Sequence, residues 1–281
     1  MPSPSTALAA DWLGVCRRAT EALRDMLEDR PTTLERAVEG GHGQGGDRSL
    51  LIDEAAEAGV FAELDAMHAL GHRFTAVSEE RGDVDYGDPG VRVVIDPIDG
   101  SLNAKRGLPH HAISIAVADG PTMADVAFAY VYDFGPREEW IARRGEGATL
   151  DGRALDPALP ERRDGSGRLE VLGIESADPR WVLEAGEDLV ARAHRLRALG
   201  SIAISLCQVA AARFDAMLSL KRCRGFDAAA GQLIVREAGG VVGFPACAEP
   251  LGAPLDLEPR SPVVAARSAQ ALAELSDVPR R

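Results

Sequence analysis

The sequence of 281 residues lacks both long apolar runs and a basic N-terminal start. No window approaches the roughly 20 apolar residues that a helix needs to cross a bilayer. The N-terminal stretch MPSPSTALAADWLG has neither the positive charge nor the continuous apolar segment of a signal peptide. We therefore expect a soluble protein of the cytoplasm with no membrane partner.

Basic residues are scarce relative to acidic ones. The chain has 31 Lys and Arg against 44 Asp and Glu, with a formal net charge of −13. Proteins that bind nucleic acid or a membrane surface usually carry a basic face, so we expect neither partner. An anionic substrate is still compatible with this charge, because bound cations reverse the local field.

Cysteine is also rare, and its spacing excludes the common zinc sites. The four cysteines are far apart and form no CxxC pair or Cys/His cluster. We expect them to be reduced thiols in a reducing compartment. The hydrophobic content of 46 % is sufficient for one large domain or for two sub-domains.

The first half of the chain has the pattern of an α+β unit. Apolar residues at helical spacing predict helices over residues 5–29 and 50–70, with a glycine-rich mobile loop at 39–49 between them. FTAVSEE and VRVVIDP are typical of strands, the second buried because its apolar run is nearly continuous. Three runs of alternating hydrophobicity between residues 111 and 145 predict an antiparallel meander.

The second half alternates strands and helices, which is typical of a layered and mainly parallel α/β unit. A helix is expected near residues 181–194, and short strands are expected in GGVVGF and SPVVAARS. The boundary is expected in the Gly- and Pro-rich segment DGRALDPALPERRDGSG. We predict an α+β sub-domain over 1–154 and an α/β sub-domain over 155–281.

The segment VVIDPIDGSLN, residues 93–103, sets two carboxylates three residues apart where a buried strand ends. Gly100 after Asp99 lets a ligand approach the backbone. Ser101 favours a helix start, whose free N–H groups would point where Asp96 and Asp99 face. Carboxylates next to free N–H groups that bind an anion indicate a hard cation such as Mg²⁺ between the carboxylates and the anion. The alternative is an Asx-turn with an N-cap aspartate.

Two further acidic segments point to the same kind of site. Glu79 lies in Ser78-Glu79-Glu80 at the end of a predicted strand, and Asp227 starts a helix of small residues in GFDAAAGQLIVREAGG. Taken singly, they also fit a solvated turn and an N-cap. SEE, DPIDGSLN and FDAAAGQLIVREAGG in this order resemble the three signatures of the inositol monophosphatase family. That family's relatives include fructose-1,6-bisphosphatases and 3′-phosphoadenosine phosphatases.

The resemblance runs from IDEAAE, residues 52–57, to the EAGG segment, and it implies a fold, a cofactor and a set of site residues. The implied fold is a layered α-β-α-β-α sandwich, and the implied cofactor is a cluster of two or three Mg²⁺ ions. The implied metal ligands are Glu79, Asp96, the Ile98 carbonyl, Asp99 and Asp227. The implied catalytic residues are Asp53, Ser101 and Glu79. Lithium sensitivity and a homodimer are expected by the same analogy.

The mechanism that the resemblance implies is hydrolysis by a metal-activated water. Asp53 and Ser101 would orient this water, and the backbone N–H groups of Gly100 and Ser101 would receive the phosphate. Aspartates two apart, as in the DxDGT motif of haloacid-dehalogenase-type phosphatases, would indicate an aspartyl nucleophile instead. Here the spacing is three.

The substrate is a small phosphorylated sugar or polyol by the same resemblance, with inositol 1-phosphate first. Ser201, in LGSIAISL, resembles the family turn that contacts substrate hydroxyls, and Asp99, Gly100 and Arg224 are further candidate contacts. No acid matches the family residue that grips inositol, whereas Lys221, Arg222 and Arg224 stand ahead of Asp227. These cations form either a solvated strand end or a site for a second phosphate or sugar acid.

Other functions stay open at this point. A fructose-1,6-bisphosphatase or a 3′(2′),5′-bisphosphate nucleotidase is the nearest alternative. From another class, the chain is a catalytically weak protein that binds a sugar phosphate or regulates a partner.

Overall fold

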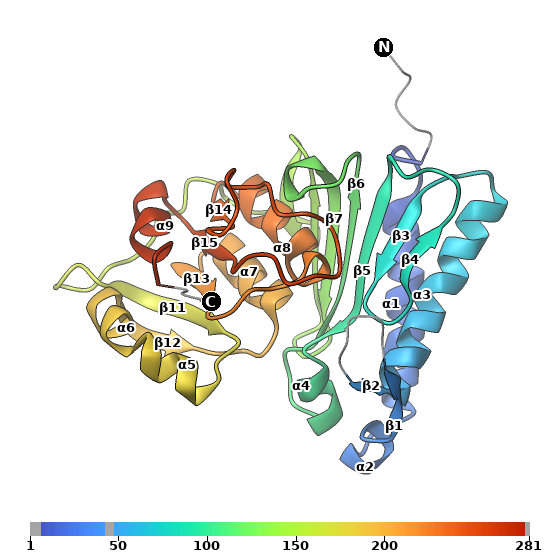
Figure 1. Cartoon of the computed structure of the whole chain (residues 1–281), viewed down its shortest axis with the longest axis horizontal. Helices are drawn as coiled ribbons and strands as arrows, with labels where there is room; N and C mark the ends of the chain where they lie inside the picture. Colours follow the sequence, from blue (N-terminus) through green and yellow to red (C-terminus); the bar gives the residue numbers. More distant parts are fainter. Residues whose placement is uncertain (1–6, 43–47, 279–281) are drawn as a thin grey trace.

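The computed structural model describes residues 7–42 and 48–278, and it shows alternating layers of helices and sheets (Figure 1). The helices are α1 (Trp12–Glu28), α2 (Thr33–Arg36), α3 (Leu51–Ala69), α4 (Ser101–Arg106), α5 (Pro179–Glu184), α6 (Gly186–Arg192), α7 (Ile202–Ala210), α8 (Gly225–Glu237) and α9 (Ala269–Leu275), with a 3₁₀ turn at Met123–Asp125. The order of layers is α1 and α3, a large sheet, α7 and α8, a smaller sheet, and an outer layer of α5, α6 and α9. The expected α-β-α-β-α sandwich is confirmed.

The large sheet contains the expected meander. Its strands are β3 (Thr75–Ser78), β4 (Gly82–Asp85), β5 (Arg92–Asp99), β6 (Ala112–Ala118), β7 (Val126–Asp133), β8 (Glu138–Arg143), β9 (Gly147–Leu150) and β10 (Arg153–Ala154). Their order is β10-β9-β8-β7-β6-β5-β3-β4. Neighbours from β5 to β10 run antiparallel, while β3 lies parallel to β5. The parallel pair brings Glu79, directly after β3, and Asp96 and Asp99, at the end of β5, to the same edge of the sheet.

The smaller sheet is mainly parallel, as the alternation of strands and helices predicts, and it contains one reversed strand. Its strands are β11 (Leu169–Glu175), β12 (Ala193–Arg197), β13 (Ala216–Ser219), β14 (Val241–Gly243) and β15 (Val264–Ala266), in the order β12-β11-β13-β15-β14. β12, β11 and β13 are parallel, but β15 runs antiparallel to both β13 and β14. The residues between β14 and β15 form a loop, without the crossover helix that a parallel pair requires.

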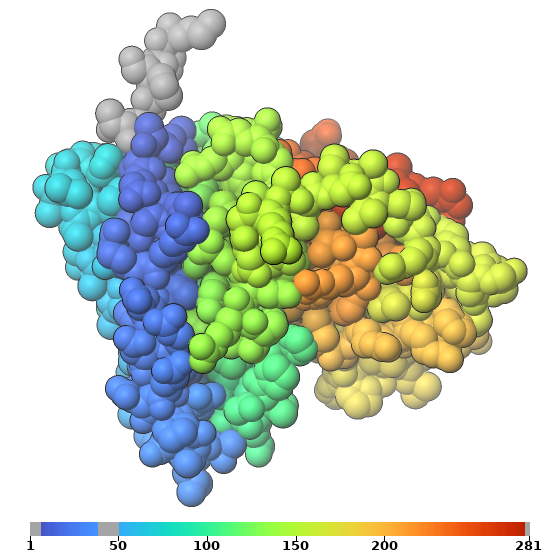
Figure 2. Space-filling model, turned by 180° about the vertical axis from the view of Figure 1, so that it is seen from behind, coloured from blue at the N-terminus to red at the C-terminus, as the bar shows by residue number. Residues whose placement is uncertain are grey.

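The middle layer joins the two sheets through close helix packing. A Cβ added to Gly231 of α8 would lie 2.7 Å from the Leu206 side chain of α7, so a larger residue would force the helices apart. The run Ala228–Ala230 is buried with it. Seen from behind, the N-terminal half of the chain lies beside the C-terminal half (Figure 2). The division at 154 and 155 stays a prediction, although the last strand of the large sheet ends at Ala154.

Three local expectations need correction. The first helix begins at Trp12, because the Asp11 side chain accepts a hydrogen bond from Gly14 N and caps the helix there. Within the predicted loop at 39–49, β1 (Glu39–His42) and β2 (Arg48–Leu50) pair antiparallel, while residues 43–47 lie outside the described part. The helix expected near 181–194 is split into α5 and α6, with β12 following at once.

Two further findings concern membrane-spanning helices and the cysteines. In the described ranges 7–42 and 48–278, no helix is both long and apolar enough for a bilayer crossing. All four cysteines are free thiols, and Cys16, Cys207 and Cys223 are buried.

Candidate active site

The end of β5 carries the two aspartates of VVIDPIDGSLN. Asp96 lies opposite Ser114 and Asp99 opposite Ala112, so β5 has one residue more than β6 over this interval. Such a bulge bends the strand and redirects its side chains. Asp96 also accepts a hydrogen bond from Ile98 N at 3.0 Å, as in an Asx-turn. The turn predicted as the alternative is therefore present in the same place as the candidate metal ligands.

Gly100 makes the sharp turn from β5 into α4. Its φ is +87°, and a Cβ there would lie 2.9 Å from the carbonyl oxygen of His110 and 3.1 Å from that of Gly200. Only glycine fits both the conformation and the space. The backbone N–H groups of Gly100 and Ser101 are thereby placed at the start of α4, where the sequence predicts phosphate binding.

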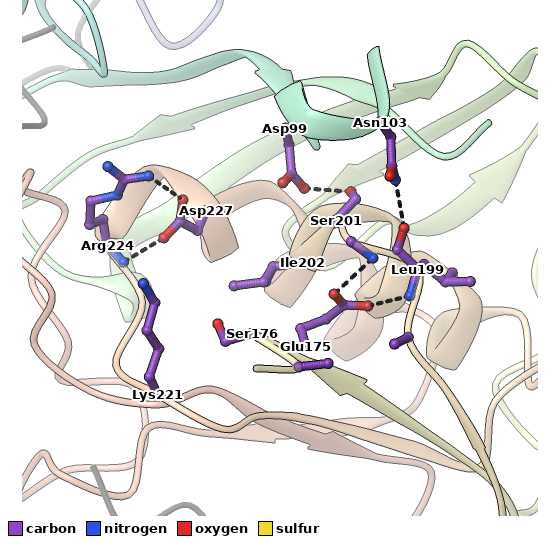
Figure 3. Close-up of a pocket in the computed structure, with 13 residues that line it drawn as sticks. Asp99, Asn103, Glu175, Ser176, Leu199, Ser201, Ile202, Lys221, Arg224 and Asp227 are labelled. Atoms are coloured by element: carbon purple, nitrogen blue, oxygen red, sulfur yellow. Dashed lines mark hydrogen bonds and ion pairs between the residues drawn. The ribbon is translucent and has the colours of Figure 1, made fainter. Parts of the chain in front are cut away.

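Asp99 connects the end of β5 to the start of α7. Its Oδ2 accepts hydrogen bonds from Ser201 Oγ at 2.6 Å and from Ala203 N at 2.7 Å. The same Ser201 hydroxyl caps α7 by accepting from Ile204 N at 3.1 Å. The structure thus places Ser201 in the pocket with its hydroxyl on a candidate metal ligand (Figure 3). Its contact with a substrate stays a prediction.

Glu57 fixes the turn that carries Glu79. This carboxylate of α3 is 2 % exposed and accepts hydrogen bonds from the Ser78 hydroxyl and from Arg81 N. The Arg81 guanidinium lies 3.3 Å from its other oxygen. Asp53, one turn earlier on α3, is 8 % exposed. The i, i+4 spacing indicates one helix face for the two acids, and both are buried.

Arg224 lies between Glu79 and Asp227. Its Nη2 is 3.0 Å from Glu79 Oε1 and 3.6 Å from Asp227 Oδ1. Its backbone N–H separately donates to Asp227 Oδ2 at 2.7 Å. The guanidinium stacks on the Phe226 ring, 4.5 Å from the ring centre. This side chain therefore provides a cation for two of the acids that the family resemblance assigns to Mg²⁺.

The acids of this cluster hold their protons more tightly than usual. Burial raises the pKa of Glu79 to about 8, with Arg224 opposing the shift and Asp227 adding to it. Burial also raises the pKa of Asp99 to about 7, against the hydrogen bond from Ser201. The pKa values of Asp96 and Asp227 are likewise raised by burial, and Glu79 and Asp99 add to the shift of Asp96. The cluster carries more acid than its surroundings neutralise.

The donor chemistry of this cluster fits a hard divalent cation. Its side chains offer only oxygen and are mostly buried, and Glu79, Asp99 and Asp227 raise the pKa of other acids in the cluster, so a bound cation would relieve their repulsion. In this conformation, however, no three His, Cys, Asp or Glu side chains in the described ranges are grouped around one ion position. The Arg224 guanidinium stands between two of them. The ligand set stays a prediction, and its chemistry is compatible with Mg²⁺.

A pocket of about 410 Å³ opens beside the cluster (Figure 3). Asp99 lines it beside Ser201, while Asp227, Arg224 and Lys221 line another side. Lys221 Nζ is 5.6 Å from the centre of the Trp181 ring. Arg222, the third cation of the predicted group, is exposed on the same segment. Of the three cations, two thus line this pocket, and their contact with substrate stays a prediction.

Sequence reasoning missed Glu175, which lines the pocket at the end of β11. One carboxylate oxygen accepts from Leu199 N at 3.0 Å and from Ser205 Oγ at 2.6 Å, and the other accepts from Gly200 N at 3.0 Å. These bonds hold the turn before α7. The available signal was an acid directly after an apolar strand, the pattern that also marks Asp96.

Sequence reasoning also missed the link that the Asn103 side chain makes between two turns. Its side-chain amide donates to the carbonyl oxygens of His110 at 2.9 Å and Leu199 at 2.7 Å. The turn after β5 is thereby linked to the turn before α7, which belongs to the other half of the chain.

Comparison with known proteins identifies the family of this chain. The profile of the inositol monophosphatase family matches residues 9–278. A fructose-1,6-bisphosphatase/inositol-1-monophosphatase of Methanothermobacter thermautotrophicus is 32 % identical over 243 residues, covering 82 % of this chain and 83 % of that protein. Nus factor SuhB of Escherichia coli is 33 % identical over 233 residues, covering 82 % and 84 %.

Solved structures agree with the sequence relatives. The extragenic suppressor protein SuhB of Bartonella henselae superposes with a TM-score of 0.76 at 26 % identity, covering 97 % of this chain and 99 % of that one. The chain belongs to the inositol monophosphatase family. It is accordingly a phosphatase-family protein, as the three acidic signatures predict.

Proposed function

We propose that this protein is a Mg²⁺-dependent phosphomonoesterase that hydrolyses a small sugar or polyol phosphate, with inositol 1-phosphate as the first candidate. The observation that carries the proposal is the cluster of mostly buried acids with raised pKa values beside an open pocket, which Asp99 and Asp227 line. Family membership supports the phosphatase chemistry. Cytoplasmic location, lithium sensitivity and a homodimer are parts of the same proposal.

The proposed reaction breaks the phosphorus–oxygen ester bond by direct attack of water. Bound Mg²⁺ would neutralise phosphate charge, acidify a water molecule and stabilise the leaving alkoxide. Glu79, Asp96, Asp99, Asp227 and the Ile98 carbonyl would hold the metal. Asp53 on α3 and the Ser101 hydroxyl would orient the attacking water, while N–H groups at the start of α4 would hold the phosphate.

Site variants test the metal-ligand assignment. Asp96→Asn removes a charge from the centre of the cluster, and we expect Mg²⁺-dependent hydrolysis to fall by at least about a hundredfold. Asp83→Asn is the matched control, because Asp83 is exposed on β4 of the same sheet. Full activity of Asp96→Asn would refute the assignment. A trapped aspartyl-phosphate would exclude direct attack by water.

A second candidate is fructose 1,6-bisphosphate. Lys221 and Arg224 on one wall of the pocket favour a substrate with a second anionic group, and one relative bears both activities in its name. The test is a panel of inositol 1-phosphate, fructose 1,6-bisphosphate and 3′-phosphoadenosine 5′-phosphate with wild type and Lys221→Gln. Selective loss of the bisphosphate activities in Lys221→Gln would support this candidate. Binding without turnover of any ester would instead favour a catalytically weak protein that binds a sugar phosphate or regulates a partner. Nus factor SuhB is among the relatives.

A further inference from the structure

Arg224 contacts two acids of the cluster at the same time. Its guanidinium is within ion-pair distance of both Glu79 and Asp227, at 3.0 and 3.6 Å. The side chains involved are mostly buried, with exposed fractions of 19 % for Arg224, 20 % for Glu79 and 14 % for Asp227. Screening by water is therefore limited, and these contacts matter to the charge of the cluster.

We propose that Arg224 is the counter-ion of the metal-free enzyme, and that Mg²⁺ competes with its guanidinium for the carboxylates of Glu79 and Asp227. The inference rests on the proposed function. Arginine stays protonated at every accessible pH, so the conflict between two cations is resolved only by movement of the side chain.

The surroundings of Arg224 permit this movement. The guanidinium is not enclosed, because Arg224 lines the pocket of about 410 Å³. Asp227 does not depend on the guanidinium for its position, since the Arg224 backbone N–H holds its other oxygen at 2.7 Å. The guanidinium can stay stacked on the Phe226 ring while it moves away from Glu79. Metal uptake therefore requires a side-chain rotation and leaves the start of α8 in place.

The experiment measures Mg²⁺ binding without substrate. Isothermal titration of metal-free wild type, Arg224→Gln and Arg224→Lys gives the three dissociation constants. We expect Arg224→Gln to bind Mg²⁺ about threefold to tenfold more tightly than wild type, because two ion pairs no longer oppose binding. Arg224→Lys keeps the charge and should lie between the two. Arg222→Gln, which removes the same charge from an exposed position two residues earlier, is the control and should match wild type.

Thermal unfolding gives an independent readout. The melting temperature of metal-free Arg224→Gln should fall by about 2–4 °C, since the acids lose their counter-ion, while saturating Mg²⁺ should bring it to the wild-type value. A uniform structural defect would lower both values, and that outcome would overturn the proposal.

Two further results separate this inference from the proposed function. Equal Mg²⁺ affinity in wild type and Arg224→Gln, or a Mg²⁺-bound crystal structure with Arg224 still paired to Glu79, would overturn the inference alone. Absence of Mg²⁺ binding in all four proteins would overturn the proposed function together with it.

Discussion

Glu175→Gln tests how the wall of the pocket is held. The substitution keeps the shape of the side chain and exchanges one carboxylate oxygen for an NH₂ group. Both oxygens of Glu175 accept bonds from backbone N–H groups, one from Leu199 and the other from Gly200. In either orientation of the amide, its NH₂ group faces a backbone N–H that then has no acceptor in Glu175.

The expected loss follows from these bonds. A hydrogen bond to a charged acceptor contributes about 1.5–3 kcal/mol, and a buried donor left without a partner costs about 1–3 kcal/mol. The substitution also removes a buried charge, whose burial raises the pKa of Glu175, and this gain offsets part of the loss. We expect the free energy of unfolding to fall by about 1–2 kcal/mol.

Urea unfolding of the metal-free protein measures this difference, with Glu170→Gln as the control. Glu170 lies on the same strand β11 but is exposed, so its substitution should change the free energy of unfolding by less than about 0.5 kcal/mol. The turn held by Glu175 carries Ser201, the candidate contact for substrate hydroxyls. KM for the substrate should therefore rise more than kcat falls. Identical midpoints and KM values for the two variants would refute the argument.

Two further predictions concern the acid cluster and the turn beside it. The metal-free protein should lose stability between pH 5 and pH 8, because burial raises the folded-state pKa of Asp99 to about 7 and of Glu79 to about 8, so the folded state holds more protons than the unfolded chain in this window. Melting temperatures at several pH values, with and without saturating Mg²⁺, check this, and a metal-free melting temperature that rises with pH contradicts it. Gly100→Ala should lower stability by about 2–4 kcal/mol and abolish hydrolysis, since its Cβ would meet the His110 carbonyl in a left-handed conformation. Gly71→Ala is the matched control, because Gly71 has a φ of +98° with nothing within 4 Å of the added Cβ, and equal losses in the two variants would show that φ alone matters.

The features that were predicted correctly from sequence have local signals. The apolar run of β5 predicts a buried strand whatever surrounds it, and Gly100 predicts a tight turn. Asp227 before a run of small residues predicts the start of α8. Alternating hydrophobicity gives the meander, because each strand of it faces the same two layers.

The features that were missed depend on tertiary contacts. The ion pair between Glu79 and Arg224 joins residues 145 positions apart, and no local pattern specifies it. The partners of Glu175 lie in a turn more than twenty residues later. The reversed direction of β15 depends on how the loop between β14 and β15 crosses the sheet. Short pairs such as β1 and β2 leave little signal in a glycine-rich stretch.

The bond between Ser201 and Asp99 has a consequence for how this protein could acquire a new substrate. One wall of the pocket shares its hydrogen bonds with the acid cluster, so a substitution at Ser201 that suits another substrate would also disturb Asp99. Lys221, which also lines the pocket and lies near the Trp181 ring, has no hydrogen bond to Asp99 among the contacts of that carboxylate described above. Changes of specificity that keep the reaction intact are therefore easier to select at Lys221 than at Ser201.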